Sequence, residues 1–388
     1  MSEKNKDLLV SSGRPARKEA RHVNLPIELG STMVFDTMDA FEAARDNRYQ
    51  SGTMFYGRYG NEASYQLENV LAELEGAAGV TLTSSGVAAI SLTLQSLVNP
   101  GDHLLVADNV YGNTRAFCER VLPAQQVDVE FFDAATGAQV SELFRSNTAA
   151  VMFEAPGTGT FEFPDIQGIA TAAREASVVS VLDGTWATAI FCQPLALGVD
   201  VLVYSGSKYI CGHSDCMFGV IASAQQQHHD DIRHSVMSYG DKIGSHEVFL
   251  ALRGLRTLEL RMQTVNQSGL TIAKWFAQQP QVLQVLHPAL PDCPGHEYWK
   301  QYCSGSAGLF GVVFTPVSDE RINRFVEALH HFGIGVSWGG YESLVLPVKP
   351  VRTATQWQHQ GQLVRFNIGF ESTESLIEDI QSAITLLS

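Results

Sequence analysis

Lys208 stands where an apolar strand is expected to end, in the stretch VLVYSGSKYICGHSD over residues 201–215. A buried ammonium group is unfavourable unless it is paired, neutralised or consumed in a covalent bond. Ser205 and Ser207 lie just before it with hydroxyls that can bind phosphate, and a neutral amine is a nucleophile for a carbonyl group. A lysine at a strand end can also simply extend to solvent, so this stretch leaves both interpretations open.

Three further positions combine polar or aromatic groups with an expected strand end. Gly86 and Val87 open a helix after the strand GVTLTSS, so their N–H groups can bind an anion, although an ordinary capped helix has the same pattern. Asp183 follows the strand SVVSVL, where a carboxylate can cap the next turn or hold a protonated ring nitrogen. Tyr111 follows DHLLVAD and could stack on a flat ligand or serve only in packing.

Taken together, these positions offer complementary chemistry. They supply a phosphate anchor, an aromatic ring to stack, a carboxylate for a ring nitrogen and an amine for an aldehyde. This set predicts a site for pyridoxal 5′-phosphate, in which Lys208 would form a Schiff base with the cofactor. The combination is far more specific than any of its members.

The elements that must position these groups alternate between helices and short apolar strands. Helical spacing covers residues 64–79 and 86–98, and strands are expected over 79–85, 102–108, 128–132, 149–156, 177–184 and 199–205. Apolar strands separated by helices predict an α/β protein with a doubly wound, mostly parallel sheet. In such sheets ligands bind at the carboxyl ends of the strands, where the polar positions above are expected.

The pattern divides the chain into three predicted parts. An arm over residues 1–60 has too little periodic structure to form its own core and must lie on something else. Residues 61–255 form the cofactor-binding domain, and one long helical stretch over 246–278 leads out of it. Residues 256–388 form a smaller C-terminal α/β domain, with strands over 307–315 and 362–370 and helices over 321–333 and 372–387.

Composition narrows the class of protein. A formal charge of −15 provides no basic surface, so neither nucleic acid nor an anionic membrane is an expected partner. The polar first residues do not resemble a signal peptide and no segment has the length of a spanning helix, so a cytoplasmic protein is expected. The six cysteines are scattered and are expected to be reduced; Cys211 and Cys216 flank His213 and Asp215, but zinc needs a second half-site, so no metal is expected.

The sequence resembles the pyridoxal-phosphate-dependent enzymes of cysteine and methionine metabolism, from about residue 24 to the C-terminus. The stretches that carry the resemblance are FYGRYGNEASYQLENVLAELEG, SSGVAAI, SKYICGHSD, LRGLRTLELRMQ, HPALPDCPGHEYWKQYCSGSAGLF and SWGGYESL. The resemblance implies the fold type I transferase-like architecture, with a large doubly wound sheet domain and a smaller C-terminal α/β domain.

The resemblance also implies roles for individual residues. Lys208 and Tyr111 would be catalytic, with Tyr111 stacked on the cofactor ring. The implied cofactor-binding residues are Tyr56, Arg58, Gly86, Val87, Tyr111, Asp183, Ser205, Ser207 and Lys208. Tyr56 and Arg58 would reach in from a neighbouring subunit, which would explain the arm. Arg365 would clamp the substrate α-carboxylate, with Ser337 and Trp338 in the adjoining loop.

The implied reaction is that of a carbon–sulfur β-lyase that cleaves L-cystathionine to homocysteine, pyruvate and ammonia, and that also acts on cystine and cysteine. Trp338 favours this reaction over those of γ-synthases and γ-lyases, which commonly have leucine at this position. Gly184 and Ser207 depart from the usual asparagine and threonine. A chain that binds the cofactor without turnover is a remote alternative. The family implies a homotetramer, and a shared phosphate site requires at least a dimer.

Overall fold

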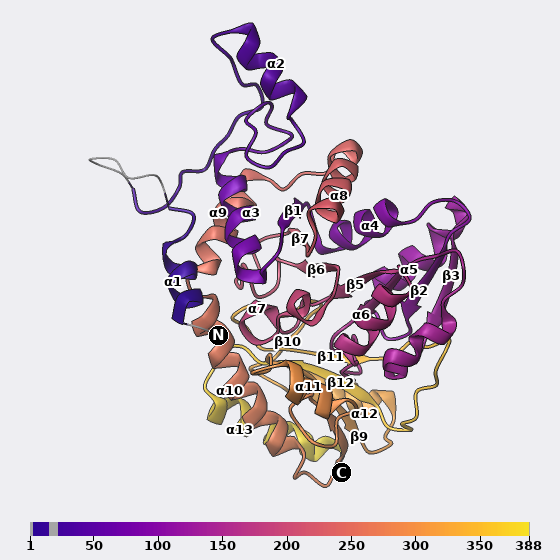
Figure 1. Cartoon of the computed structure of the whole chain (residues 1–388). Helices are drawn as coiled ribbons and strands as arrows, with labels where there is room; N and C mark the ends of the chain where they lie inside the picture. Colours follow the sequence, from indigo (N-terminus) through magenta and orange to yellow (C-terminus); the bar gives the residue numbers. More distant parts are fainter. Residues whose placement is uncertain (1–2, 15–21, 388) are drawn as a thin grey trace.

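A computed structural model describes residues 3–14 and 22–387 of the chain, and Figure 1 shows its two sheets. The large sheet has seven strands in the order β1-β7-β6-β5-β4-β2-β3. These are β1 (Gly79–Thr83), β2 (His103–Ala107), β3 (Asp128–Phe132), β4 (Thr148–Glu154), β5 (Val179–Asp183), β6 (Val201–Ser205) and β7 (Gly219–Ser223). The strands predicted from the sequence are all present as β1 to β6, whereas β7 was not predicted.

The large sheet is mostly parallel, as the sequence predicts. Strands β3, β2, β4, β5 and β6 run parallel, and β7 is inserted antiparallel between β6 and β1. Every residue of β1, β2 and β7 is buried, because helices cover the sheet and its strands are apolar throughout. The associated helices are α3 (Glu62–Glu75), α4 (Gly86–Leu97), α5 (Gly112–Arg120), α6 (Ile166–Glu175), α7 (Thr188–Phe191), α8 (Gln226–Tyr239) and α9 (Ser245–Leu255).

A second, smaller unit contains a five-stranded sheet in the order β10-β11-β12-β9-β8. Its elements are α10 (Leu258–Phe276), β8 (Val282–Leu286), α11 (His296–Tyr302), β9 (Leu309–Phe314), α12 (Asp319–Glu327), β10 (Gly333–Ile334), β11 (Leu344–Val348), β12 (Leu363–Asn367) and α13 (Thr373–Ile384). Phe276 packs against Phe310, Phe314 and Phe366, so α10 shares an aromatic core with this sheet. This arrangement agrees with the predicted fold type I architecture of a large and a small α/β unit.

The stretch predicted as one helix over residues 246–278 is two helices. The backbone N–H groups of Arg256 and Thr257 bond to the carbonyls of Arg253 and Gly254, three residues back, so the chain turns between α9 and α10. The Arg256 guanidinium leaves the helical path and donates to the carbonyls of Leu9 and Ser12. A tertiary contact with the N-terminal segment therefore accompanies the break.

The N-terminal region is only partly attached to the large unit. Helix α1 (Glu3–Ser11) buries Leu8 and Leu9, but α2 (Met38–Asp46) contains no buried residue. The segment around α2 projects from the rest of the molecule in Figure 1. Residues 1–2 and 15–21 of the predicted arm lie outside the described residues. The proposed domain limits at residues 60 and 255 stay predictions.

Candidate active site

Lys208 lies just beyond β6 and faces a loop of the small unit. Its Nζ donates a hydrogen bond to Ser337 Oγ at 2.8 Å and lies 5.6 Å from the centre of the Trp338 ring. Burial lowers the pKa of Lys208, and the Arg365 charge lowers it further, while Asp183 partly offsets both effects. Arg365 and Asp183, which are both predicted site residues, therefore act on the charge of Lys208. The lowered pKa increases the fraction of Lys208 that carries a neutral amine.

Asp183 is the last residue of β5 and is 6% exposed. Its Oδ1 accepts hydrogen bonds from Thr185 N at 3.0 Å and from Thr185 Oγ1 at 2.5 Å. Burial raises the pKa of Asp183, and the bonds from Thr185 and the charge of Lys208 oppose that rise. Among the described residues no hydrogen bond reaches Oδ2, so this carboxylate oxygen is open to a further donor.

Glu154 is a second carboxylate at the same edge, and the sequence analysis did not identify it. It ends β4 directly beside Asp183 in the sheet register. Burial raises its pKa well above the usual range, and the neighbouring Asp183 raises it further. Its position after the apolar run AAVMF resembles that of Asp183 after its own strand, and this signal could have identified it.

Tyr111 is held at the edge through its backbone. Its N–H donates to Glu154 Oε2 at 2.7 Å, and its hydroxyl accepts a bond from Asn113 Nδ2 at 2.8 Å. The side chain is 40% exposed, although aromatic rings are usually more buried than this. The ring therefore has a free surface on which a flat ligand could stack.

The predicted phosphate-binding groups meet where α4 begins. Gly86 is so close to the end of β6 that a Cβ there would lie 2.6 Å from Ser205 Cβ. Ser85 caps the helix through Ala88 N, which leaves the N–H groups of Gly86 and Val87 at its first positions. The Ser207 hydroxyl is engaged differently: it accepts from Phe218 N at 2.9 Å and donates to Phe218 O at 3.2 Å.

Arg365 comes from β12 of the small unit. Its Nη2 donates to the carbonyl oxygens of Ser337 at 3.0 Å and Gly335 at 3.3 Å. Its Nε is buried and has no hydrogen-bond partner within the described part of the chain. Burial lowers the pKa of Arg365, partly offset by Tyr111, and an unpaired buried N–H of a guanidinium suits an incoming carboxylate.

The loop that faces Lys208 has an unusual backbone. Ser337 has a φ of 78°, in the left-handed region that non-glycine residues rarely occupy. Gly339, two residues later, has a φ of 83° and lies against Lys208, where an added Cβ would be 3.2 Å from the lysine backbone. This conformation directs the Ser337 hydroxyl and the Trp338 ring at the amine.

Tyr56 and Arg58 lie in the N-terminal segment, apart from the groups above. Tyr56 forms an isolated bridge with Thr32, and 41% of the Tyr56 side chain is exposed. Arg58 donates to Met237 O at 2.6 Å and to Tyr59 Oη at 2.8 Å. Within residues 3–14 and 22–387, no hydrogen bond joins either residue to the strand ends that carry Lys208 and Asp183.

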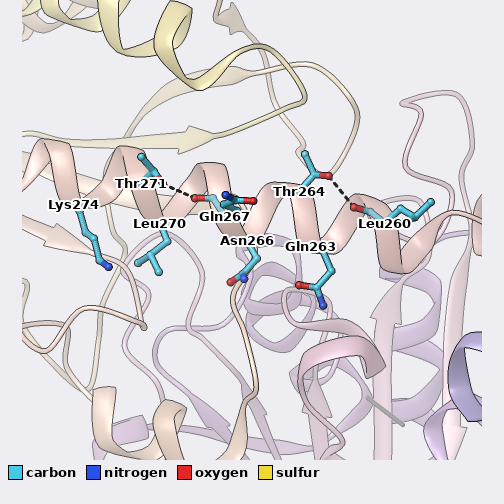
Figure 2. Close-up of a pocket in the computed structure, with 8 residues that line it drawn as sticks. All are labelled: Leu260, Gln263, Thr264, Asn266, Gln267, Leu270, Thr271 and Lys274. Carbon is cyan, nitrogen blue, oxygen red and sulfur yellow. Dashed lines mark hydrogen bonds between the residues drawn. The ribbon is translucent and has the colours of Figure 1, made fainter. Parts of the chain in front are cut away.

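A cavity of about 90 Å³ adjoins these groups. It is lined by Glu154, Pro156, Gly157, Thr158, Gly159, Phe161, Trp186, Leu309, Trp338, Val348 and Arg365. A larger groove follows α10 and is lined only by that helix, from Leu260 to Lys274 (Figure 2). The groove contains none of the predicted site residues, so the cavity beside Arg365 is the candidate place for a substrate.

Two absences concern only the part of the chain that the structure describes. No helix there is long and apolar enough to cross a membrane. No group of three or more His, Cys, Asp or Glu side chains there is arranged to hold a metal ion.

The groups at this edge of the large sheet fit pyridoxal phosphate. Gly86 lets the start of α4 approach Ser205 more closely than a side chain would allow, Asp183 bonds to Thr185 through Oδ1 only, and Lys208 has an amine of lowered pKa. These groups match a phosphate, a protonated pyridine nitrogen and an aldehyde. The two-sheet fold and this site define a fold type I pyridoxal-phosphate-dependent enzyme.

The chain belongs to the Cys/Met metabolism PLP-dependent enzyme family, whose profile matches residues 6–385. It is 34% identical to a cystathionine beta-lyase of Haemophilus influenzae over 97% of this chain and 96% of the relative. It is 35% identical to an L-alanine/L-glutamate racemase of Wolbachia pipientis, over 99% and 98% of the two chains. The crystal structure of a cystathionine gamma synthase from Xanthomonas oryzae, in complex with aminoacrylate and cysteine, superposes with a TM-score of 0.89 at 26% identity, covering 100% and 99%.

Proposed function

We propose that this protein is a carbon–sulfur β-lyase that converts L-cystathionine and water into homocysteine, pyruvate and ammonia, and that it also acts on cystine and cysteine. The observation that carries the proposal is the position of Trp338. Its ring lies 5.6 Å from Lys208 Nζ and lines the cavity beside Arg365. A bulky indole at this place would hold the Cβ–S bond near the lysine.

Lys208 and Asp183 would perform the central chemistry. Pyridoxal phosphate would supply an aldehyde for the substrate amine and a ring able to take up electrons from Cα. Lys208, with its lowered pKa, removes the Cα proton as general base. Asp183 Oδ2 holds the proton on the ring nitrogen, and Thr185 orients the carboxylate through Oδ1. Loss of the thiolate from Cβ then completes the elimination.

The remaining residues would bind and orient. Arg365 takes the substrate α-carboxylate through its unpaired Nε, and Tyr111 covers the cofactor ring. The N–H groups of Gly86 and Val87 and the Ser205 hydroxyl hold the phosphate. The Ser207 hydroxyl donates a hydrogen bond to the Phe218 carbonyl. Ser207 would have to give up this bond to donate to the phosphate.

The phosphate site would be completed by a second copy of the chain, in a homotetramer built as a dimer of dimers. The N-terminal segment supports this because Leu29, Val34 and Met38 are 75%, 94% and 66% exposed. Apolar side chains exposed in succession favour burial against a partner. Tyr56 and Arg58 of that segment would then reach the neighbour's phosphate. Sedimentation analysis of the cofactor-loaded protein tests this, and a monomer would contradict it.

The activity is tested by comparing kcat/KM for pyruvate release from L-cystathionine, L-cystine and L-cysteine. Cystathionine is expected to be the best substrate. Formation of α-ketobutyrate instead of pyruvate would identify a γ-lyase, and the transfer of a γ-substituted substrate onto cysteine would identify a γ-synthase. Absence of turnover with every substrate would indicate a chain that only binds the cofactor. The chirality of recovered alanine and glutamate is measured alongside, because the Wolbachia relative is a racemase.

A further inference from the structure

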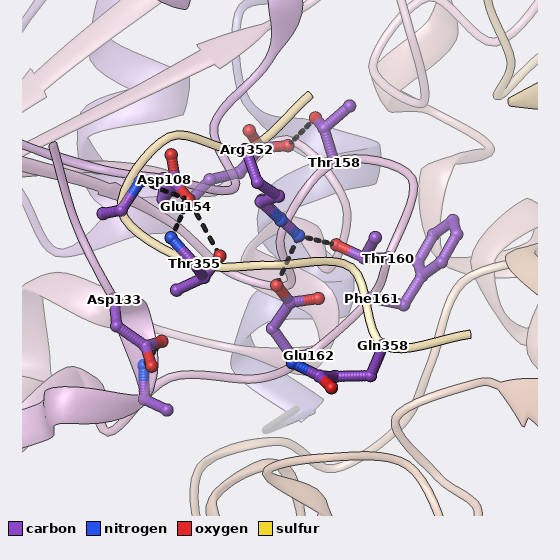
Figure 3. A network of polar contacts seen from close by, with 12 residues as sticks. Asp108, Asp133, Glu154, Thr158, Thr160, Phe161, Glu162, Arg352, Thr355 and Gln358 are labelled. Carbon is purple, nitrogen blue, oxygen red and sulfur yellow. Dashed lines mark hydrogen bonds and ion pairs between the residues drawn. The ribbon is translucent and has the colours of Figure 1, made fainter. Parts of the chain in front are cut away.

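Residues 349–362, here called the strap, connect β11 to β12 but bind to the large unit. Figure 3 shows Arg352 and Thr355 of the strap beside Asp108 and Glu162, which belong to the large unit. The partners in these contacts are far apart in the sequence, and the numbers of Asp108 and Thr355 differ by 247. The strap therefore joins the two units at the side of the molecule that carries the cavity.

Asp108 provides the first anchor. It is 2% exposed and accepts bonds from the backbone N–H groups of Thr353 at 2.9 Å, Ala354 at 3.1 Å and Thr355 at 2.8 Å. The hydroxyls of Thr353 and Thr355 donate to it as well, and Arg115 forms an ion pair with it. A carboxylate with this many donors is held in its charged form and holds the strap in one position.

Arg352 provides the second anchor. Its Nη2 donates to Glu162 Oε1 at 2.6 Å and to Thr160 Oγ1, and only 9% of its side chain is exposed. Residues 156–162 form the loop that supplies most of one wall of the cavity. At Gly159 an added Cβ would lie 3.1 Å from Val348, so the loop packs closely against the end of β11, where the strap begins.

Both anchors act on the loop over residues 156–162, which forms one wall of the cavity. Next to Asp108, the Asn109 carbonyl accepts a hydrogen bond from Thr158 N of this loop at 2.8 Å. Asp108 begins the turn that ends at Tyr111, and Glu154 fixes that turn through Tyr111 N and holds the cavity loop through Thr158. Arg352 holds the same loop at its other end. A strap that only joined two domains would not need to contact this loop, whereas both anchors hold it, one near Thr158 and the other at Thr160 and Glu162.

We propose that Asp108 and Arg352 are positioning residues that hold one wall of the cavity for the distal part of a long substrate, and so determine specificity for cystathionine over cysteine. The inference rests on the proposed function. A small amino acid would occupy only the region of Lys208 and Arg365, so loosening the strap would not affect it. A longer side chain would touch the loop that the anchors hold and would lose affinity when it is loosened, because a preorganised wall binds more tightly than a mobile one.

The test uses the cofactor-loaded enzyme with Thr355→Val and Arg352→Gln. Each variant removes one set of side-chain bonds and retains the backbone bonds to Asp108, so both are expected to fold. Gln356→Ala, at an exposed strap position, is the matched control. We expect KM for L-cystathionine to rise about tenfold in either variant, with kcat and the KM for L-cysteine changed less than about twofold.

A binding measurement separates this inference from the proposed activity. L-Alanine and L-norleucine have no leaving group, and their dissociation constants follow from the change in cofactor absorbance. The anchor variants should raise the dissociation constant of norleucine about tenfold and that of alanine less than about twofold. If the native enzyme releases no pyruvate but this selective loss appears, the activity proposal fails and the strap inference stands.

Chymotrypsin cleavage after Trp357, measured on cofactor-free protein, reports strap anchoring without any activity. We expect faster cleavage in both anchor variants and no change in Gln356→Ala. Faster cleavage with an unchanged norleucine-to-alanine ratio would show that the strap is only a structural tie and would overturn the inference. An unchanged norleucine-to-alanine ratio together with an unchanged cleavage rate would also overturn the inference, because the side-chain bonds of the anchors would then not fix the strap.

Discussion

The carboxyl edge of the large sheet and the loops of the small unit both reach Lys208, but they hold their polar groups differently. Glu154, Asp183 and Ser205 are each the last residue of a strand, and sheet register pairs Glu154 with Asp183 and Asp183 with Val203, two residues before Ser205. Ser337 and Trp338 instead stand on a loop, where the serine adopts a rare positive φ of 78°. The strands of the large unit therefore fix the positions of the polar groups around Lys208. The loop of the small unit determines the shape of the site that faces them.

This difference suggests a division of work between the two units. Under the proposed function, groups on the sheet edge would govern charge at the reacting atoms, so their loss should lower kcat. Groups on the small unit would contact the substrate, so their loss should raise KM.

Lys208→Ala should lower kcat for pyruvate release by about a thousandfold or more, because the general base and the covalent attachment point disappear together. Stopped-flow or fixed-time pyruvate assays measure the loss, and the absorbance of the lysine-bound cofactor should vanish. Lys300→Ala, at an exposed position on α11, is the control and should keep full activity. Retention of both the absorbance and the activity would contradict the assignment of Lys208.

Asp183→Asn should lower kcat about a hundredfold while KM stays within a few fold. The amide can still accept the bonds from Thr185, but it lacks the charge that favours a proton on the ring nitrogen. Steady-state kinetics on cystathionine measure the effect, with Asp230→Asn on the exposed face of α8 as the control. A change confined to KM would break the proposed division for the sheet edge.

Arg365→Lys should raise KM for cystathionine about thirtyfold with kcat within a few fold, since lysine retains the charge but not the planar pair of donors. The same series of substrate concentrations measures both constants. A fall in kcat at constant KM would show that Arg365 acts on the reaction step, and the contrast between the two units would then be wrong.

Acid should loosen the strap only at low pH, after it has protonated the sheet-edge carboxylates Asp183 and Glu154, because the pKa values of these two groups are raised whereas that of Asp108 is lowered. Burial raises the pKa of Asp108, but the bonds from Thr353, Thr355 and Arg115 outweigh it and lower the pKa to about 2. Because the folded pKa lies below the unfolded value, this stabilisation is present above about pH 4 and is lost toward about pH 2, and it amounts to about 2 kcal/mol.

The measurement for this last effect is the free energy of urea unfolding of the wild type and Asp108→Asn, compared at about pH 5 and about pH 2. The asparagine does not titrate, so the advantage of the wild type should shrink by about 2 kcal/mol as the pH falls. A difference that stays constant across this range would show that Asp108 does not gain its charge-dependent bonds on folding.

Most of the large sheet could be predicted because its signals are local. Each apolar run over 4 to 8 residues indicates a buried strand, and the first polar residue after it marks the carboxyl end. The antiparallel strand β7 was missed, although its residues GVIAS are equally apolar. It follows the Lys208 loop, where the glycines and polar residues suggested a loop and not a return into the sheet.

Glu154 and Asp108 were missed for different reasons. Glu154 has the same local pattern as Asp183, so attention to strand ends would have found it. Asp108 has no local signal of its role, because its partners Thr353 and Thr355 are about 245 positions away. Only the folded chain places the strap against the turn that begins at Asp108.

The sequence by itself determined the cofactor chemistry, because a lysine, a carboxylate and a helix start after apolar strands all meet at one edge of a parallel sheet. The tertiary structure alone decided how the small unit closes on that edge: the unpaired Nε of Arg365, the backbone of Ser337 and the anchors of the strap. The physical reason is the distance along the sequence between the residues that make each contact. Strand order and register follow from nearby residues, whereas contacts between the two units depend on the packing of the whole chain.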